Sequence, residues 1–177
     1  MSRKQPHRDN PLDDYLRHHG LLLPERRTPA GRKRYLRTAQ GGNYLLKRVI
    51  AHSAMGIIHE ADDKRCGRTI AVKIMPGAGA ESSAQTLRFI AEAQITSQLD
   101  HPNILPIHEL GMDTHQRVYY TMKFVRGNTL TTILDAIRRG RRTYIEKYPL
   151  PRLLDILLKV CDALSYAHDR GVIHRDV

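Results

Sequence analysis

Three charged residues of the sequence lie in or near short motifs that indicate a binding or catalytic role. Lys73 ends the run Ile70-Ala71-Val72-Lys73, Glu92 follows nineteen residues later, and Asp176 ends the run His174-Arg175-Asp176. An ammonium group is a compact point charge that suits phosphate oxygens, and a carboxylate beside a half-buried ammonium keeps it charged. An aspartate can accept a proton from a hydroxyl group. Taken singly, these residues would be a surface lysine, a helix-surface glutamate and a polar loop.

The strands that would position Lys73 are predicted by hydrophobic alternation and turn residues. The run that holds Lys73 alternates and is rich in Ile, Val and Ala, which is typical of a buried strand. The polar residues 62–67 form a predicted turn before it. The first three strands are joined by short turns, which indicates an antiparallel meander. The five predicted strands are Tyr44 to Ala51, Ile57 to Ala61, Arg68 to Met75, Ile104 to Leu110 and Val118 to Val125.

Glu92 lies on a helix that is predicted between the third and fourth strands. Ser82 or Ser83 would cap the start of this helix. Five strands with one inserted helix indicate an α+β arrangement. Glu92 lies at the margin of the predicted apolar stripe. The stripe recurs every four residues and consists of Leu87, Ala91, Ile95 and Leu99.

A helical region is predicted after the fifth strand. Leu130 to Ile137 is a short helix, and the residues from Arg138 to Arg142 are an exposed basic loop. A long amphipathic helix begins at Pro151 and ends at Gly171, which suits the left-handed position after a helix. The apolar stripe of the long helix consists of Leu153, Leu157, Val160, Cys161, Leu164 and Ala167.

These motifs together resemble the protein kinase family, and in particular its bacterial, Hanks-type serine/threonine members. Ile70-Ala71-Val72-Lys73 resembles the family's Val-Ala-Ile-Lys strand, and His174-Arg175-Asp176 resembles the start of its catalytic loop. His101-Pro102-Asn103-Ile104-Leu105 is similar to the link into the fourth strand. The resemblance covers about residues 44–177. It implies a five-stranded antiparallel amino-terminal lobe with one regulatory helix, followed by the first helices of an incomplete helical lobe.

The resemblance also implies a role for each matching residue. Lys73 would bind the α- and β-phosphates of ATP, Glu92 would pair with Lys73, and Asp176 would be the catalytic base. His174 would be structural, and Arg175 would meet a phosphate on the activation loop. Other residues expected to contact ATP belong to the glycine-rich loop, the lysine strand and the hinge. They are Ala51, Ser53, Gly56, Ile58, Ala71, Met122, Lys123, Phe124 and Val125.

The glycine-rich loop departs from the family pattern Gly-x-Gly-x-x-Gly-x-Val. Ala51 and Ser53 stand at the first two glycine positions, so that only Gly56 remains, with Ile58 in place of the valine. Glycine lets backbone N–H groups approach a phosphate closely, whereas a serine side chain crowds that approach. A serine hydroxyl can nevertheless donate to a phosphate oxygen. This departure keeps a second hypothesis open, a pseudokinase or kinase-like binding module.

The composition narrows the class of protein. Hydrophobic residues make up 41% and charged residues 27% of the chain, as in globular domains. Cys66 and Cys161 have no CxxC partner, so we expect neither a zinc site nor a disulfide framework, and a cytoplasmic setting. No run of 18 apolar residues occurs in the sequence, so we expect any membrane helix only downstream of Val177.

Three segments are predicted along the chain. Residues 1–43 form a basic, partly flexible extension, with a short helix after Asn10. By resemblance, residues 44–126 form the ATP-binding lobe. Residues 127–177 contain the segment that follows the hinge and the start of the second lobe. The first 42 residues hold ten Lys and Arg against four Asp and Glu, within a formal net charge of +11. This excess indicates a solvated arm or a tether to an acidic partner. No nucleic-acid-binding motif accompanies it, so we expect no specific nucleic-acid partner.

The last residue, Val177, directly follows Asp176. By resemblance, the family's lysine, asparagine and Asp-Phe-Gly would come after it, and the asparagine and the aspartate would hold magnesium. The resemblance therefore implies ATP and Mg²⁺ as cofactors, no metal ligand within this chain, and a protein hydroxyl as substrate. We expect the sequence to be part of a longer protein and to be inactive by itself.

Overall fold

The computed structural model describes residues 34–39, 41–53, 55–76 and 84–176. The expected helix after Asn10 and the expected cap at Ser82 or Ser83 lie outside these residues. The described residues form two compact units. The first contains residues 34–93 and 107–124, and the second contains residues 94–106 and 125–176.

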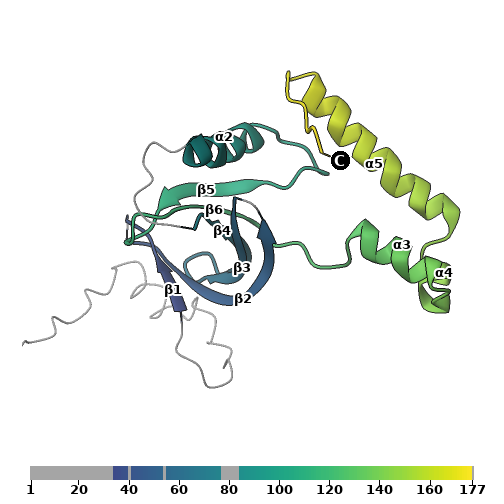
Figure 1. The fold of residues 1–177 in the computed structure, drawn as a ribbon, viewed down its shortest axis with the longest axis horizontal. Coiled ribbons are helices and arrows are strands. Elements are labelled where there is room, and N and C mark those ends of the chain that lie inside the picture. Colours follow the sequence, from purple (N-terminus) through teal and green to yellow (C-terminus); the bar gives the residue numbers. More distant parts are fainter. Residues whose placement is uncertain (1–33, 40, 54, 77–83, 177) are drawn as a thin grey trace, which may run out of the picture. The chain divides into compact units, whose positions relative to one another are not determined.

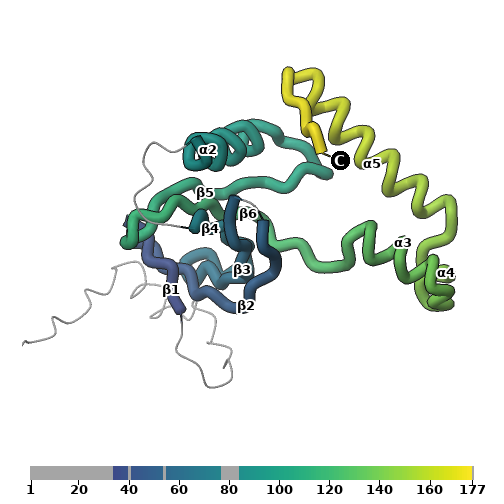
Figure 2. Tube along the Cα trace, in the orientation of Figure 1, coloured from purple at the N-terminus to yellow at the C-terminus, as the bar shows by residue number. Residues whose placement is uncertain are grey.

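A six-stranded antiparallel sheet makes up most of the first unit (Figure 1). Its strand order is β1-β2-β3-β4-β6-β5, so that β2, β3 and β4 form the expected meander and β6 lies between β4 and β5 (Figure 2). All five expected strands are present. The strands are β1 Arg34–Arg37, β2 Asn43–Ser53, β3 Gly56–Asp63, β4 Arg68–Ile74, β5 Ile107–Met112 and β6 Val118–Lys123.

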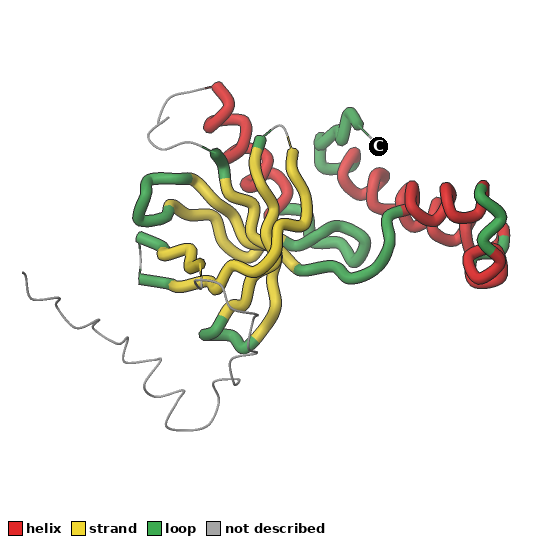
Figure 3. The backbone as a smooth tube through the Cα atoms, turned by 60° about the horizontal axis from the view of Figure 1, so that its bottom comes forward, coloured by secondary structure: helices red, strands yellow, loops and turns green. Residues whose placement is uncertain are grey.

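The sixth strand, β1, comes from the segment that was predicted as an extension. It pairs with the start of β2, and just beyond it Thr38 forms a bridge with Asp113, next to the end of β5. The sheet is therefore strongly curled, as Figure 3 shows, and its first strand reaches the β5–β6 turn. Leu36 on β1 is fully buried in the core, which explains why this arginine-rich stretch forms a strand.

The core of the first unit lies on one face of the curled sheet. On this face the hydroxyls of Tyr44 and Tyr119 both donate to Glu109, the second at 2.8 Å. Gly111 leaves room for this arrangement, because a Cβ there would lie 2.7 Å from the Tyr119 hydroxyl oxygen. The core consists of Leu36, Ala61, Ile70, Val72, Ile74 and Tyr119.

Helix α2 (Ala84–Ser97) buries a different face from the one predicted. The expected stripe is wrong within the helix, because Leu87 is 60% and Ile95 is 44% exposed; of its four residues only Leu99, just beyond the helix, is buried. The ring of Phe89 packs against Tyr120 with centroids 5.0 Å apart, and this aromatic contact decides which side of the helix faces inward. The buried residues of α2 have helical spacing too and are Thr86, Phe89 and Ala93.

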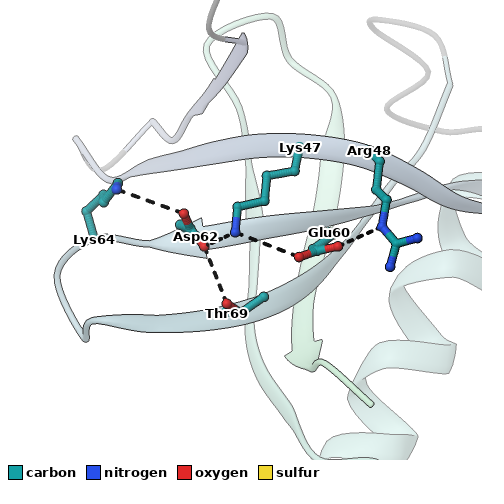
Figure 4. Close-up of polar contacts among 6 residues, drawn as sticks. All are labelled: Lys47, Arg48, Glu60, Asp62, Lys64 and Thr69. Atoms are coloured by element: carbon teal, nitrogen blue, oxygen red, sulfur yellow. Dashed lines mark hydrogen bonds and ion pairs between the residues drawn. The ribbon is translucent and has the colours of Figure 1, made fainter. Parts of the chain in front are cut away.

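A ladder of charged side chains joins β2 to β3, and the hydroxyl of Thr69 on β4 extends it (Figure 4). The Lys47 ammonium lies 2.6 Å from the Asp62 carboxylate and 3.7 Å from Glu60. Arg48 donates to Glu60 at 2.8 Å, and the Thr69 hydroxyl donates to Asp62 at 3.4 Å. Cross-strand pairs of opposite charge support the strand register, although each is worth only a fraction of a kcal/mol.

The second unit contains the helices α3 (Leu130–Arg138), α4 (Arg142–Lys147) and α5 (Leu150–His168). The Thr129 side chain caps α3 by accepting a hydrogen bond of 3.1 Å from the Thr132 N–H. The expected basic loop is shorter than predicted, because its last arginine already begins α4, a helix that the sequence did not indicate. All four arginines of this segment are exposed.

Helix α5 matches the predicted long helix, and Gly171 follows it with a φ of 73°, in the left-handed region. Its amphipathic pattern is only partly buried: Ala167 is buried, whereas Leu157 and Cys161 are exposed. Within the described part of the chain, no helix combines the length and the apolar character that crossing a membrane would require.

Candidate active site

Lys73 occupies the centre of the sheet, on β4. It pairs with Ile58 on β3 and with Tyr120 on β6. Its side chain is only 8% exposed, which is rare for a lysine without a partner. Because side chains alternate along a strand, Ala71 lies on the same face of the sheet as Lys73.

The structure brings Lys73 and Glu92 together. The Lys73 ammonium lies 2.8 Å from Oε1 and 3.1 Å from Oε2 of the Glu92 carboxylate. The Glu92 side chain is 36% exposed, so one edge of the pair remains open to solvent. An ammonium has three donor positions, which leaves it able to donate to a further acceptor such as a phosphate oxygen.

Two aromatic rings complete the surroundings of the Lys73 ammonium. Its Nζ lies 5.5 Å from the centroid of the Phe89 ring and 5.4 Å from that of Tyr120. The Tyr120 hydroxyl donates to Oε1 of Glu92 at 2.8 Å. Burial raises the pKa of Tyr120 far above its usual value, and the hydrogen bond to Glu92 adds to the shift. Neither ring was expected from the sequence, although Tyr120 lies two residues before Met122 and hence on the same face of β6.

The β2–β3 turn carries the residues that replace the glycine-rich loop. Ser53 pairs with Gly56, and the Ser53 hydroxyl donates to the Gly56 carbonyl oxygen at 2.9 Å. Gly56 is buried, and a Cβ there would lie 2.8 Å from the backbone oxygen of Ile74. Ala51 is half-buried opposite Ile58. The one remaining glycine thus stands where no side chain fits.

The expected hinge residues span the end of the first unit and the start of the second. Met122 is buried and pairs with Ala71 on β4. Lys123 is exposed at the end of β6, Phe124 is half-buried, and Val125 is 66% exposed. Of these four expected hinge residues, Met122 is therefore the one that is buried, and it belongs to the unit that holds Lys73.

The expected catalytic-loop residues belong to the second unit. His174, Arg175 and Asp176 are all exposed. The Asp176 N–H donates to Nδ1 of His174 at 3.4 Å. Arg175 has a φ of 68°, and non-glycine residues in this left-handed region are uncommon and cluster at functional sites.

The arrangement around Lys73 suits an anion and not a metal ion. A shielded ammonium with a paired carboxylate offers charge-assisted hydrogen bonds to phosphate oxygens. Across the four described stretches of the chain, no group of three His, Cys, Asp or Glu side chains could hold a metal. The described residues around Lys73 therefore fit the phosphate part of a nucleotide.

The comparisons with known proteins agree with this geometry. The family model described as "Protein kinase domain" matches residues 44–177. The serine/threonine-protein kinase PknA of Mycobacterium tuberculosis is 38% identical over 140 residues, which are 77% of this chain and 31% of that protein. The serine/threonine-protein kinase PknD of Chlamydia pneumoniae is 33% identical over 137 residues, which are 76% of this chain and 15% of that protein.

A solved structure is similar as well. The crystal structure of the M. tuberculosis PknI kinase domain superposes with a TM-score of 0.55 at 29% sequence identity, covering 76% of this chain and 51% of that one. The chain thus spans less than a third of the length of the two curated relatives. Residues 44–177 carry the family's motifs on the family's fold, and the chain belongs to the protein kinase family.

Proposed function

We propose that the protein is an ATP-dependent serine/threonine kinase, which transfers a phosphoryl group from ATP to a protein hydroxyl. The observation that carries this proposal is the shielded ion pair of Lys73 and Glu92, whose shortest distance is 2.8 Å. A nearly buried ammonium that is held by one carboxylate is suited to grip phosphate oxygens. Two relatives that share more than 30% identity are named serine/threonine-protein kinases, which supports the choice of hydroxyl.

Several of the expected residues have a defined role in this proposal. Lys73 binds the phosphates that stay on the nucleotide, and Glu92 keeps the ammonium charged and oriented. Met122 borders the base, while backbone groups of Lys123 to Val125 hydrogen-bond to it. The attacking substrate hydroxyl gives its proton to the Asp176 carboxylate as its oxygen bonds to phosphorus and the ADP oxygen leaves. Magnesium would neutralise charge on the phosphates, with ligands from outside the described residues.

Replacing Lys73 tests the proposed function. In the protein that contains this chain, Lys73→Met should abolish transfer of labelled phosphate from ATP to a serine/threonine substrate, because the ammonium that would grip the phosphate oxygens is lost. Lys47→Met is the matched control, since Lys47 is also a strand lysine paired with a carboxylate, at 2.6 Å. It should keep nearly full activity. Equal activity in the two variants, or no transfer by the parent protein, would contradict the proposal.

A binding module that does not transfer phosphate is the alternative, and the Ser53 hydrogen bond favours it. The Ser53 hydroxyl is engaged with the Gly56 carbonyl at 2.9 Å and is not free for a phosphate in this conformation. Titration calorimetry with Mg-ATP separates the two functions when it is combined with the transfer assay. Nucleotide binding without transfer would support the binding module, whereas binding with Lys73-dependent transfer would exclude it.

A further inference from the structure

One oxygen of Glu92 is shared by two donors that stand side by side in the sheet. Lys73 on β4 and Tyr120 on β6 are directly paired in the strand register. The Lys73 ammonium and the Tyr120 hydroxyl each lie 2.8 Å from the same Oε1 atom. Two neighbouring strands therefore hold a single carboxylate on α2 from two directions.

The two donors differ in how firmly they are held. The ammonium of a lysine ends a flexible four-carbon chain, whereas the hydroxyl of a tyrosine is fixed by a rigid ring. Tyr120 is 4% exposed, and its ring packs against Phe89 of the same helix, which is fully buried. The hydroxyl is thus a fixed point against which the half-exposed carboxylate is aligned.

We propose that Tyr120 is a positioning residue for phosphoryl transfer, because its hydroxyl holds Glu92 in the orientation in which Glu92 holds Lys73. The expected effect on catalysis rests on the proposed kinase function. The positioning itself rests on the contacts of Tyr120 with Glu92 and Phe89 and on the contact of Lys73 with Glu92. In this arrangement α2 cannot move away from the sheet without breaking the hydroxyl bond together with the ion pair. Tyr120 therefore favours the conformation in which Lys73 is ready to bind phosphates.

The neighbouring tyrosine provides a matched control. Tyr119 is also buried on β6, and its hydroxyl also donates to a glutamate at 2.8 Å, but that glutamate is Glu109 on the opposite face. Tyr119→Phe and Tyr120→Phe thus remove the same atom from the same strand and the same kind of bond. Only the second change touches the Lys73–Glu92 pair.

Steady-state kinetics of the protein that contains this chain separate positioning from stability. Tyr120→Phe should lower kcat about tenfold with a smaller change in KM for ATP, because a hydrogen bond to a charged group is lost. Tyr119→Phe should lower the melting temperature by about as much as Tyr120→Phe does, but it should leave kcat unchanged. In a Glu92→Gln background, Tyr120→Phe should cause little further loss, since interacting residues are not additive. Equal kcat losses in the two tyrosine variants, or full additivity with Glu92→Gln, would overturn the proposal.

The reactivity of the Lys73 amine gives a readout that does not depend on activity. Brief acetylation followed by mass spectrometry reports how often this amine is unpaired, with Lys47 and Lys64 as internal references. Lys73 should be acetylated several-fold faster in Tyr120→Phe than in Tyr119→Phe, because a loosened carboxylate leaves the amine free more often. Equal rates would overturn the role of Tyr120. An inactive parent protein would contradict only the proposed function, since the labelling result still decides this inference.

Discussion

His59 is a buried histidine whose charge is suppressed by its surroundings. It is 5% exposed on β3, and within the described residues its Nδ1 atom is buried without a hydrogen-bond partner. Burial lowers the pKa of His59, and the positive charges of Arg34 and Arg117 and the nearby His52 lower it further. The surroundings of His59 in the folded protein therefore favour the neutral imidazole over the protonated one.

The stability of the protein should consequently decrease in mild acid. Below the ordinary histidine pKa of about 6.5 the unfolded chain binds a proton that the folded chain excludes, so the free energy of unfolding falls until the lowered pKa is reached. His59 contributes at most about 1.4 kcal/mol per pH unit. Urea unfolding at several pH values should show a smaller acid loss in His59→Phe than in the parent.

The exposed His115 supplies the control for this effect. His115→Phe should leave the pH dependence as it is in the parent protein. If His59→Phe and the parent lose the same free energy of unfolding between neutral and mildly acidic pH, the buried imidazole is not the cause.

Site residues that belong to a family motif could be predicted from the sequence. Site residues that matter only through contacts in the folded structure could not. Lys73 and Glu92 were expected to pair because they match the strand lysine and the helix glutamate of the family that the sequence resembles, and they lie in contact. Tyr120 was not anticipated, because its importance comes from a hydroxyl that meets Glu92 only once α2 is packed on the sheet. The hydrogen bond of Ser53 to Gly56 depends in the same way on how closely the turn folds back.

At the scale of the element, β1 extends the lobe beyond the residues that the family model matches. That match begins at residue 44, whereas Leu36 on β1 is fully buried in the core. Residues 34–37 therefore belong physically to the sheet, although they were predicted to lie in the extension.

Truncating Leu36 should destabilise the first unit. Leu36→Ala removes a fully buried side chain and should lower the free energy of unfolding by about 2–5 kcal/mol. Its neighbour Tyr35 is 41% exposed, so Tyr35→Ala should cost much less despite the larger side chain. Urea unfolding of the two variants measures the difference. Similar losses would mean that β1 does not contribute to the core.

Strands were easier to predict than helix faces. The meander of β2, β3 and β4 follows from alternation and short polar turns, and each strand lies within two residues of its expected bounds. The face of α2 was mispredicted because Leu87 and Ile95 have the same helical spacing as the residues that are buried. Hydrophobic periodicity shows that a helix has an apolar stripe, but α2 has two candidate stripes. The stripe that is buried is the one with the aromatic ring of Phe89, which packs against Tyr120.

At the scale of the whole molecule, the second unit exposes a row of leucines along α5. Leu150 and Leu158 are 68% and 66% exposed, and Leu154 and Leu157 are about half exposed. Contiguous exposed apolar side chains of this kind favour association. The 177-residue chain by itself should therefore self-associate in a concentration-dependent way.

Size-exclusion chromatography coupled to light scattering measures this association. The double variant Leu154→Glu and Leu158→Glu should shift the chain towards the monomer, because the two residues lie one helical turn apart on one face. Leu87→Glu serves as the control, since Leu87 is 60% exposed on a different helix. A monodisperse monomer of the unsubstituted chain would contradict the expectation.

The bridge between Thr38 and Asp113 has a consequence for how the lobe is made on the ribosome. Thr38 and Asp113 are separated in the sequence by most of the first unit, so the contact at the end of β1 cannot form until residue 113 has been synthesised. The hairpins of β2, β3 and β4 are local and can close while synthesis continues. During that interval β1 is held by its pairing with β2 alone, so its other edge stays open to solvent and to other chains.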